Sequence, residues 1–320
     1  MFTTIDARSL LNAREIKSSF RNQNTIAESV NLSGFGFWTG NDVTLQFRPA
    51  PPNSGVVFVR ADLLGHPRIP ALVEHRTNKP RQTSLMYQNA GVDMVEHVLA
   101  ALYGLRIDNC EIWTDQPEMP GFDGSSQVFV NALQASGIVA QSAVRPIRVI
   151  TRAFYIGNDD AYMIATTNRH GNCEFQYTLV PSAGYPTQTQ RFQTELMPEN
   201  FCRDLAQTRT FLAKHEAEEL LAKGLCRRVT PQNVLVLTES GPLDNSFLYD
   251  NECARHKTLD MVGDFAMLGC DVVGTFESFR GGHTLNAECV RQLLVKTMLL
   301  DTDKAASLYR QGQEFFRGAA

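Results

Sequence analysis

The sequence predicts an α+β fold with two domains in tandem, each a mainly antiparallel sheet covered on one side by helices. Short segments of alternating apolar and polar residues are followed by helical segments, and this order occurs twice, restarting near residues 141–145. The length of 320 residues also corresponds to about two domains. We therefore expect an N-terminal extension over 1–25, a first domain over 26–143 and a second domain over 144–320.

The first domain is expected to hold strands, a helix, a returning strand and a second helix. The first helix is predicted over Asp93–Tyr103, with Asp93 as its cap and Glu96 at the spacing of a capping box. Its apolar stripe lies on the side opposite His97, so this histidine must face solvent or a second layer. The other expected elements are strands at Ile26–Ser33, Val43–Pro49, Gly55–Arg60, His66–Val73 and Asp108–Trp113 and a helix at Gln127–Ala135.

The second domain is expected to repeat this order around an insertion at about 207–239. The insertion contains a helical piece, Lys214–Lys223, and an apolar strand, Asn233–Leu237. Two long helical stretches follow it, at 251–264 and, mostly helical, at 284–309. The remaining expected elements are strands at Arg145–Ile156, Ala161–Thr167, Cys173–Val180 and Thr189–Leu196 and a helix near Glu199–Leu205.

Composition and charge exclude several classes of function. A net charge of −4 and a pI near 6.0, without a basic run, argue against nucleic-acid binding. No apolar stretch is long enough to span a membrane. The N-terminal residues lack the apolar core of a secretory signal, and Asp6 and Glu15 argue against a mitochondrial presequence. Seven scattered cysteines without a C-x-x-C pattern indicate reduced thiols, so we expect a cytoplasmic protein and also a monomer.

A set of histidines and acids indicates a metal site. His256, Asp260 and a further acid four residues later share one face of a predicted helix, although a solvated face with ordinary ion pairs explains that segment equally well. Catalytic zinc takes three nitrogen or oxygen ligands and keeps one position open. His97 with His256 and Asp260 would supply such a set. Glu96 would be placed to act as a general base, to serve in a capping box, or both, and His283 opens another helix.

Five motifs of distinctive sequence follow one another along the chain: Met94–Asn109, Pro117–Ser125, Thr208–Phe211, Arg255–Asp264 and Gly282–Asn286. In this order they resemble the motifs of UDP-3-O-acyl-N-acetylglucosamine deacetylases, the zinc amidases that commit bacteria to lipid A synthesis. The resemblance extends from about Ser29 to about Leu294.

This resemblance implies hydrolysis of the N-acetyl group of UDP-3-O-(3-hydroxyacyl)-N-acetylglucosamine, a small-molecule substrate, to acetate and the free amino sugar. It implies Zn²⁺ as cofactor, with Fe²⁺ as a possible substitute. Three metal ligands are implied, His97, His256 and Asp260, with Glu96 as general base.

The same resemblance implies roles for five further residues. His283 would act as an acid or as an electrostatic stabiliser, and Asp264 would orient it. Thr210 would lie near the reacting group, Lys257 near polar groups of the substrate, and Phe211 against the sugar.

The family's architecture places the helices of both domains between the two sheets, so the resemblance implies that His97 faces the other domain. It also implies that the insertion is a βαβ unit that forms a passage for the acyl chain. Its leucines are candidates for the lining of that passage, although local packing explains each of them equally well: Leu212, Leu220, Leu221 and Leu225.

Some residues depart from the family pattern. Trp38 stands where the family has a histidine, Met94 stands where threonine is common, and Gly121-Phe122 replace an aliphatic pair. Two alternatives stay open, and only the first of them draws support from Trp38. One is a non-catalytic relative that binds UDP-acyl sugars, and the other is a zinc amidase that acts on a related sugar nucleotide.

Overall fold

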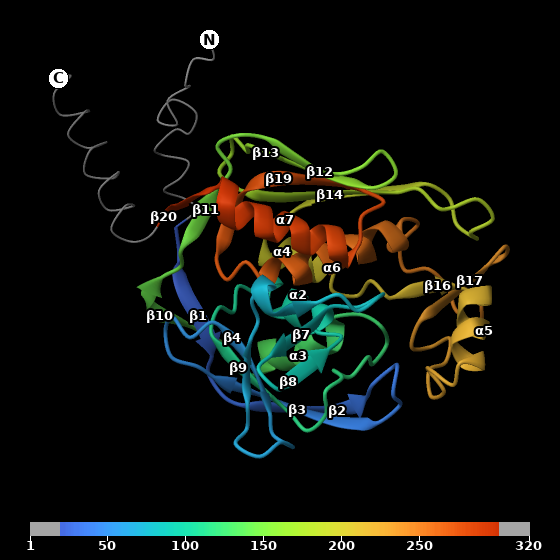
Figure 1. Cartoon of the computed structure of the whole chain (residues 1–320), viewed down its shortest axis with the longest axis horizontal. Helices are drawn as coiled ribbons and strands as arrows, with labels where there is room; N and C mark the ends of the chain where they lie inside the picture. Colours follow the sequence, from blue (N-terminus) through green and yellow to red (C-terminus); the bar gives the residue numbers. More distant parts are fainter. Residues whose placement is uncertain (1–19, 301–320) are drawn as a thin grey trace, which may run out of the picture.

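The protein is a sandwich of two sheets with helices between them, as predicted (Figure 1). The computed structural model describes residues 20–300. Most of the predicted N-terminal extension and the last part of the predicted helix at 284–309 lie outside these residues. The division at 143/144 stays a proposal; β10 ends one residue after it, at Val144, and β11 begins at Ile147.

The first sheet has the strand order β2-β3-β9-β4-β5. Buried and exposed side chains alternate along β3, so one face of this sheet packs on the core and the other faces solvent. A small sheet of β6, β7 and β8, which sequence analysis did not predict, leads into the first helix. The strands are β1 (Asn22–Ile26, paired with β10), β2 (Val30–Phe35), β3 (Asp42–Pro49), β4 (Val56–Arg60), β5 (Arg68–Pro70), β6 (Arg76–Thr77), β7 (Ser84–Tyr87), β8 (Ala90–Asp93), β9 (Cys110–Thr114) and β10 (Ile138–Val144).

The second sheet is built around β19, a long strand that sequence analysis missed. It pairs with β13 antiparallel and with β11 and β14 in parallel. The predicted helix at 284–309 ends at Lys296, because the chain then forms a short strand that pairs with β11. The strands of this sheet are β11 (Ile147–Val149), β12 (Phe154–Gly157), β13 (Tyr162–Thr166), β14 (Cys173–Leu179), β15 (Gln190–Glu195), β19 (Asp271–Phe279) and β20 (Met298–Leu300).

Helices from both halves fill the space between the sheets, and the insertion projects at one side (Figure 1). The insertion contains a parallel β16/β17 pair with α5 between its strands, which is the βαβ unit expected. The bounds are α2 (Glu96–Gly104), α3 (Gln127–Ala135), α4 (Pro198–Asp204), β16 (Phe211–Ala213), α5 (Lys214–Ala222), β17 (Leu235–Thr238), β18 (Gly241–Pro242), α6 (Glu252–Ala266), α7 (His283–Lys296) and a 3₁₀ turn, η2 (Val73–His75).

The predicted cap of the first helix is wrong. Asp93 ends β8 and binds Lys79 at 2.8 Å, and the turn at Met94, with φ +57°, precedes a helix that begins only at Glu96. No side chain caps this helix. The Glu96 carboxylate instead accepts a hydrogen bond from the backbone N–H of Thr83, at 2.9 Å. Glu96 is therefore turned toward the β6–β8 sheet and the interior.

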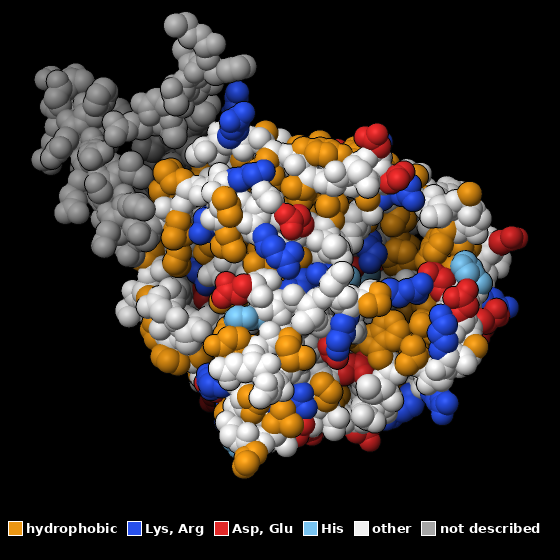
Figure 2. Space-filling model, in the orientation of Figure 1, with side chains coloured by type: hydrophobic (Ala, Val, Ile, Leu, Met, Phe, Trp, Pro, Cys, Tyr) orange, Lys and Arg blue, Asp and Glu red, His pale blue; other side chains and the backbone are white. Residues whose placement is uncertain are grey.

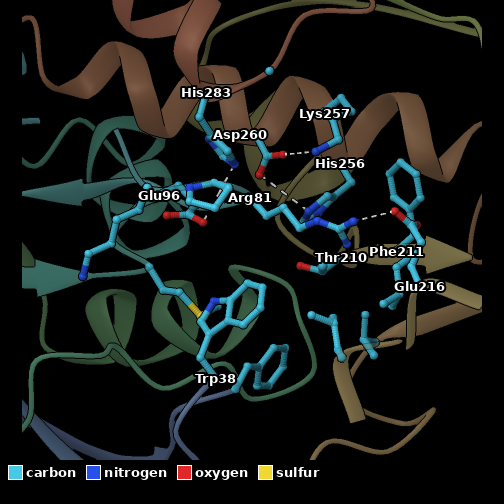
Figure 3. A pocket seen from close by; sticks show the side chains of 18 of the residues that line it. Trp38, Arg81, Glu96, Thr210, Phe211, Glu216, His256, Lys257, Asp260 and His283 are labelled. Carbon is cyan, nitrogen blue, oxygen red and sulfur yellow. Dashed lines mark hydrogen bonds and ion pairs between the residues drawn. The ribbon is translucent and has the colours of Figure 1, made fainter. Parts of the chain in front are cut away.

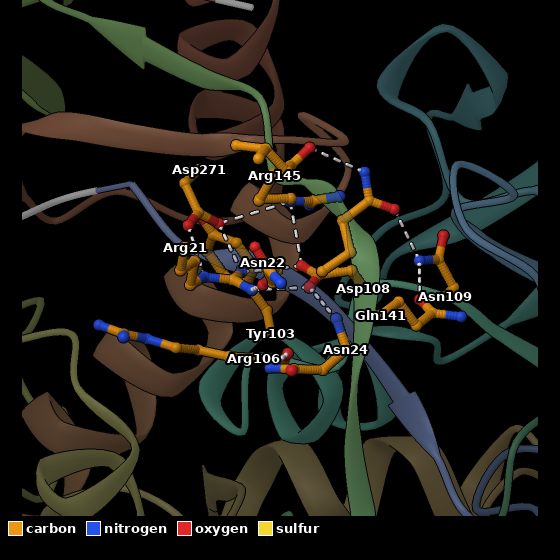
Figure 4. A network of polar contacts seen from close by, with 12 residues as sticks. Arg21, Asn22, Asn24, Tyr103, Arg106, Asp108, Asn109, Gln141, Arg145 and Asp271 are labelled. Atoms are coloured by element: carbon orange, nitrogen blue, oxygen red, sulfur yellow. Dashed lines mark hydrogen bonds and ion pairs between the residues drawn. The ribbon is translucent and has the colours of Figure 1, made fainter. Parts of the chain in front are cut away.

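A buried network of charged residues joins the two halves (Figure 4). The Arg21 guanidinium donates to both oxygens of Asp108, at 2.6 and 2.8 Å, and to both oxygens of Asp271, at 2.8 and 2.9 Å. Arg145 Nε lies 3.0 Å from Asp108 Oδ1. Asp108 precedes β9 of the first sheet and Asp271 opens β19 of the second. The network thus connects the two sheets through charges that Arg21 shares between Asp108 and Asp271.

The two halves pack closely where α2 meets α6. A Cβ at Gly263 would lie 2.1 Å from the backbone oxygen of Glu96, so only glycine allows these helices to pack at this distance. His256, Asp260 and Asp264 are 2%, 3% and 0% exposed. The alternative that these three residues form a solvent-exposed polar face is therefore wrong, because this face of α6 is buried against α2.

We expect Gly263→Ala to lower the free energy of unfolding by roughly 1–3 kcal/mol, because the added methyl group overpacks the α2–α6 contact. Urea unfolding followed by circular dichroism measures this change. Ala222→Ser, which adds one atom at an exposed position of α5, is the control and should shift stability by less than about 0.5 kcal/mol. Equal stability of Gly263→Ala and the unmodified protein would contradict the close packing.

Candidate metal centre

Three predicted ligands meet at the interface between α2 and α6. His97 comes from the first turn of α2, and His256 and Asp260 come from successive turns of α6. Asp260 Oδ1 lies 3.6 Å from His97 Nε2 and 3.5 Å from His256 Nε2, and one ligand atom of each residue lies within 4.8 Å of the others. The centroids of the two imidazole rings are 5.2 Å apart, and the ring planes are nearly perpendicular. Two distant segments thus converge on one point.

This donor set fits a zinc ion. Ligand atoms that each lie about 2.0–2.2 Å from one tetrahedral zinc are roughly 3.3–3.6 Å from one another, which matches the two spacings around Asp260 Oδ1. Two imidazoles and one carboxylate supply three protein ligands, so a fourth position would stay open for water or substrate.

Neighbouring groups orient the ligands. His256 Nδ1 lies 3.1 Å from the backbone oxygen of Thr208, which leaves Nε2 for a metal. Lys257 Nζ binds Asp260 Oδ2 at 2.7 Å, which leaves Oδ1 facing both histidines. Burial lowers the pKa of His256 to about 3, so its ring is neutral near pH 7. Although burial alone would raise it, the charge of Lys257 holds the pKa of Asp260 well below its ordinary value.

A second group of titratable residues lies beside the three ligands. Glu96 Oε1 is 4.0 Å from His283 Nε2, and Glu96 is only 3% exposed. His283 Nδ1 lies 2.9 Å from Asp264 Oδ2. Burial raises the pKa of Glu96. Burial lowers the pKa of His283, but the charge and hydrogen bond of Asp264 outweigh it and raise that pKa to about 9. At neutral pH a protonated His283 therefore faces the Glu96 carboxyl group.

Two residues of this group were not found by sequence analysis. The Thr83 hydroxyl donates to Asp264 Oδ1 at 2.5 Å and lies 3.2 Å from His283 Nδ1. Asn286 Nδ2 donates to Asp264 Oδ2 at 2.8 Å. The spacing of Asn286, three residues after His283 on α7, could have suggested its place on the same face. Nothing in the sequence around Thr83 indicates that the β6–β8 sheet carries it to α6.

The other predicted site residues surround the same centre, as Figure 3 shows. The Phe211 ring packs edge-on to His256 with centroids 6.2 Å apart, and Lys257 Nζ lies 5.6 Å from the Phe211 centroid. The Thr210 hydroxyl donates to the backbone oxygen of Gly124 at 3.0 Å, so it must turn away from Gly124 before it can donate to a substrate. Trp38 lines the cavity from the opposite wall, and its backbone N–H donates to Glu118.

A cavity of about 1090 Å³ connects the metal centre with the insertion. Figure 2 shows the hollow at this side of the molecule, floored by apolar side chains and bordered by charged ones. Three of the predicted leucines, Leu212, Leu220 and Leu221, line it, while Leu225 does not. No helix among residues 20–300 is long and apolar enough to cross a membrane.

Comparison with known proteins agrees with this geometry. Residues 23–295 match the family model described as LpxC, UDP-3-O-acyl N-acetylglycosamine deacetylase. The chain belongs to this family. It is 34% identical over 281 residues to the UDP-3-O-acyl-N-acetylglucosamine deacetylase of Myxococcus xanthus (strain DK1622), covering 87% of this chain and 88% of that protein. It is 36% identical over 282 residues to the protein of the same name in Anaeromyxobacter dehalogenans (strain 2CP-C), covering 88% of each.

The chain is also similar to a longer protein. The chain is 33% identical over 317 residues to the bifunctional enzyme LpxC/FabZ of Chlorobaculum tepidum, covering 90% of this chain and 67% of that protein. The match to the family model covers both halves of the sandwich, including α2, α6 and all of α7 except Lys296. All the residues that form the centre therefore lie within the region shared with the LpxC family.

Proposed function

We propose that the protein hydrolyses the N-acetyl group of UDP-3-O-(3-hydroxyacyl)-N-acetylglucosamine, giving acetate and UDP-3-O-acyl-glucosamine, the committed step of lipid A biosynthesis. The observation that carries this proposal is the convergence of His97, His256 and Asp260, with Glu96 and His283 beside them, in a member of a deacetylase family. Two imidazoles, one carboxylate and a neighbouring base are the parts that metal-assisted amide hydrolysis requires.

We propose zinc as the metal, held by His97 Nε2, His256 Nε2 and Asp260 Oδ1, with Fe²⁺ as a possible substitute. When bound, such a metal lowers the pKa of water and polarises an amide carbonyl. Lys257 keeps Asp260 ionised, and the Thr208 carbonyl fixes the tautomer of His256.

Glu96 acts in this proposal as the general base that takes a proton from the attacking water. Its position in α2, next to His97 and held by the Thr83 N–H, points a carboxylate oxygen into the site. Protonated His283, oriented by Asp264, stabilises the negative charge that develops on the carbonyl oxygen. Glu96 or His283 then delivers a proton to the departing amine, and a rotated Thr210 hydroxyl adds a further donor.

The remaining cavity accommodates the rest of the proposed substrate. We assign the apolar branch at the insertion, lined by Leu212, Leu220 and Leu221, to the acyl chain. Phe211 would pack on the sugar and Lys257 would contact its polar groups. The seven free cysteines among the described residues suit a reducing compartment, so we propose a cytoplasmic protein, acting as a monomer.

The direct test is to purify the protein, measure its zinc content and follow acetate release from UDP-3-O-acyl-N-acetylglucosamine. Metal removal by a chelator should abolish acetate release, and added zinc should restore it. Substrates that differ in acyl-chain length would then define the capacity of the passage. A zinc-loaded protein that binds this sugar nucleotide without releasing acetate would overturn the proposal.

The rate should fall as the pH rises through about 9, because His283 then loses the proton that makes it a charged donor. Asp264→Asn removes the charge that keeps this proton in place, so the alkaline fall should move to lower pH by about one unit or more. Initial rates from about pH 6 to pH 10 measure both profiles. Asp159→Asn, at an exposed position, is the matched control. An unshifted alkaline limb in Asp264→Asn would contradict the role given to His283.

A further inference from the structure

A buried arginine faces the catalytic cavity without a hydrogen-bond partner. Arg76, on β6, is 9% exposed and lines the cavity that holds the metal centre. Its Nε and Nη2 atoms are fully buried and donate to no partner among residues 20–300. A guanidinium in such a place is costly, because burial removes it from water and nothing replaces the lost hydrogen bonds. Arg76 therefore requires an explanation.

A role in neutralising nearby acids does not explain why Arg76 is buried without a hydrogen-bond partner. Asp264 and Glu96 are close enough to Arg76 to act on it electrostatically. Their carboxylates already have other donors: Thr83, His283 and Asn286 for Asp264, and the Thr83 N–H for Glu96. Neither forms a hydrogen bond with the guanidinium. The planar fork of Arg76, which matches two oxygens of a carboxylate or phosphate, is left for a ligand.

Arg76 lies in a branch of the cavity that differs from the proposed acyl passage. Thr284, Glu288 and Arg291 follow one face of α7 at helical spacing, and all three line the cavity. The branch thus extends from His283 along about two turns of α7, roughly 12 Å. The opposite wall is the chain around β6, which contributes Arg76 and Lys79. The Thr284 hydroxyl and Asn78 meet across it at 3.4 Å.

The other cations of this branch already have acidic partners. Lys79 binds Asp93 at 2.8 Å, and Arg291 lies 3.6 Å from Glu288. Of the three, only Arg76 forms no ion pair with a carboxylate within the described chain, and its Nε and Nη2 have no hydrogen-bond partner there. The branch thus offers a small anion one buried site with charge and geometry, close to the centre where the proposed reaction takes place.

We propose that Arg76 is the binding site for the acetate product and that the branch along α7 is its exit route. This inference rests on the proposed deacetylation. In that reaction the oxygen of water bonds to the acetyl carbon, the carbon–nitrogen bond breaks, the amine takes a proton, and the acetyl group leaves as a carboxylate anion. The acyl chain fills the apolar branch at the insertion, so acetate leaves past His283. Nε and Nη2 of Arg76 are covered in this structure, so the side chain turns into the branch to place these two N–H donors on the two oxygens of acetate.

The test is acetate binding to the full-length protein, measured with ¹³C-labelled acetate by NMR in the metal-free and the zinc-loaded forms. Metal-free protein excludes binding of acetate to the metal itself. We expect saturable binding that weakens by about tenfold or more in Arg76→Gln, because both charge-assisted hydrogen bonds are lost. Arg76→Lys keeps the charge but lacks the two parallel N–H donors, so its acetate affinity should lie between those of the unmodified protein and Arg76→Gln. Arg152→Gln, a matched change at an exposed arginine, should bind acetate like the unmodified protein.

Thermal unfolding separates this role from a structural one. If Arg76 is kept for a ligand, Arg76→Gln removes a buried charge and leaves the melting temperature unchanged or raises it. A lower melting temperature with unchanged acetate binding would overturn the proposal, and so would the absence of saturable binding to the metal-free protein. Acetate binding needs no turnover, so its loss and the failure of deacetylation are separate outcomes.

Discussion

Replacing Glu96 by glutamine is expected to lower kcat for acetate release by about 10²–10⁴-fold while the zinc content stays unchanged. Glutamine keeps the shape of the side chain and can still accept the hydrogen bond from the Thr83 N–H, but it cannot take a proton. Glu96 lies next to His97 without belonging to the three ligands, so metal binding does not depend on its charge. Steady-state kinetics with metal analysis of the same sample measures both quantities.

The control for this variant is Glu239→Gln, at an exposed position outside the cavity. It should leave kcat and zinc content at their original values. The role of general base would be refuted if Glu96→Gln retained full activity. Loss of zinc together with activity would instead assign Glu96 a part in holding the metal.

Local periodicity predicted those parts of the site that depend on a single helix. The four-residue spacing of His256 and Asp260 places both side chains on one face of α6, as observed. The helix at Gln127–Ala135 has the predicted bounds. The apolar stripe of α2 correctly predicted that His97 points away from the core of its own domain. That His97 faces the other domain was predicted only from the family resemblance, because residue spacing along one helix does not indicate which helix lies opposite.

Contacts between distant segments could not be predicted in this way. Thr83 reaches Asp264 across 181 residues of sequence. It lies just before β7, and its backbone oxygen accepts a hydrogen bond from Val95 N–H at the start of α2, at 3.1 Å. The strand β19 was not predicted, although it forms the centre of the second sheet, because it is buried on both faces near Val272–Gly274 and so lacks a strict alternation of apolar and polar residues. Arg76 has no sequence signal at all. Its significance depends on burial and on the absence of a hydrogen-bond partner among residues 20–300, which only the folded structure shows.

His256→Ala is expected to weaken zinc binding by about a hundredfold or more and to abolish acetate release, since it removes one of three ligands where loss of a supporting partner alone costs 10–100-fold. The neutral ring of His256 contributes little to folding through charge, so the metal-free variant should remain folded by circular dichroism. Zinc added at about 100 times its dissociation constant should stabilise the unmodified protein by about 2.7 kcal/mol, and the same zinc concentration should have little effect on the variant. His215→Ala, at an exposed position of α5, should retain both the binding and the stabilisation. Wild-type zinc affinity in His256→Ala would show that α2 and α6 do not share a metal, and amide hydrolysis would then require a different centre.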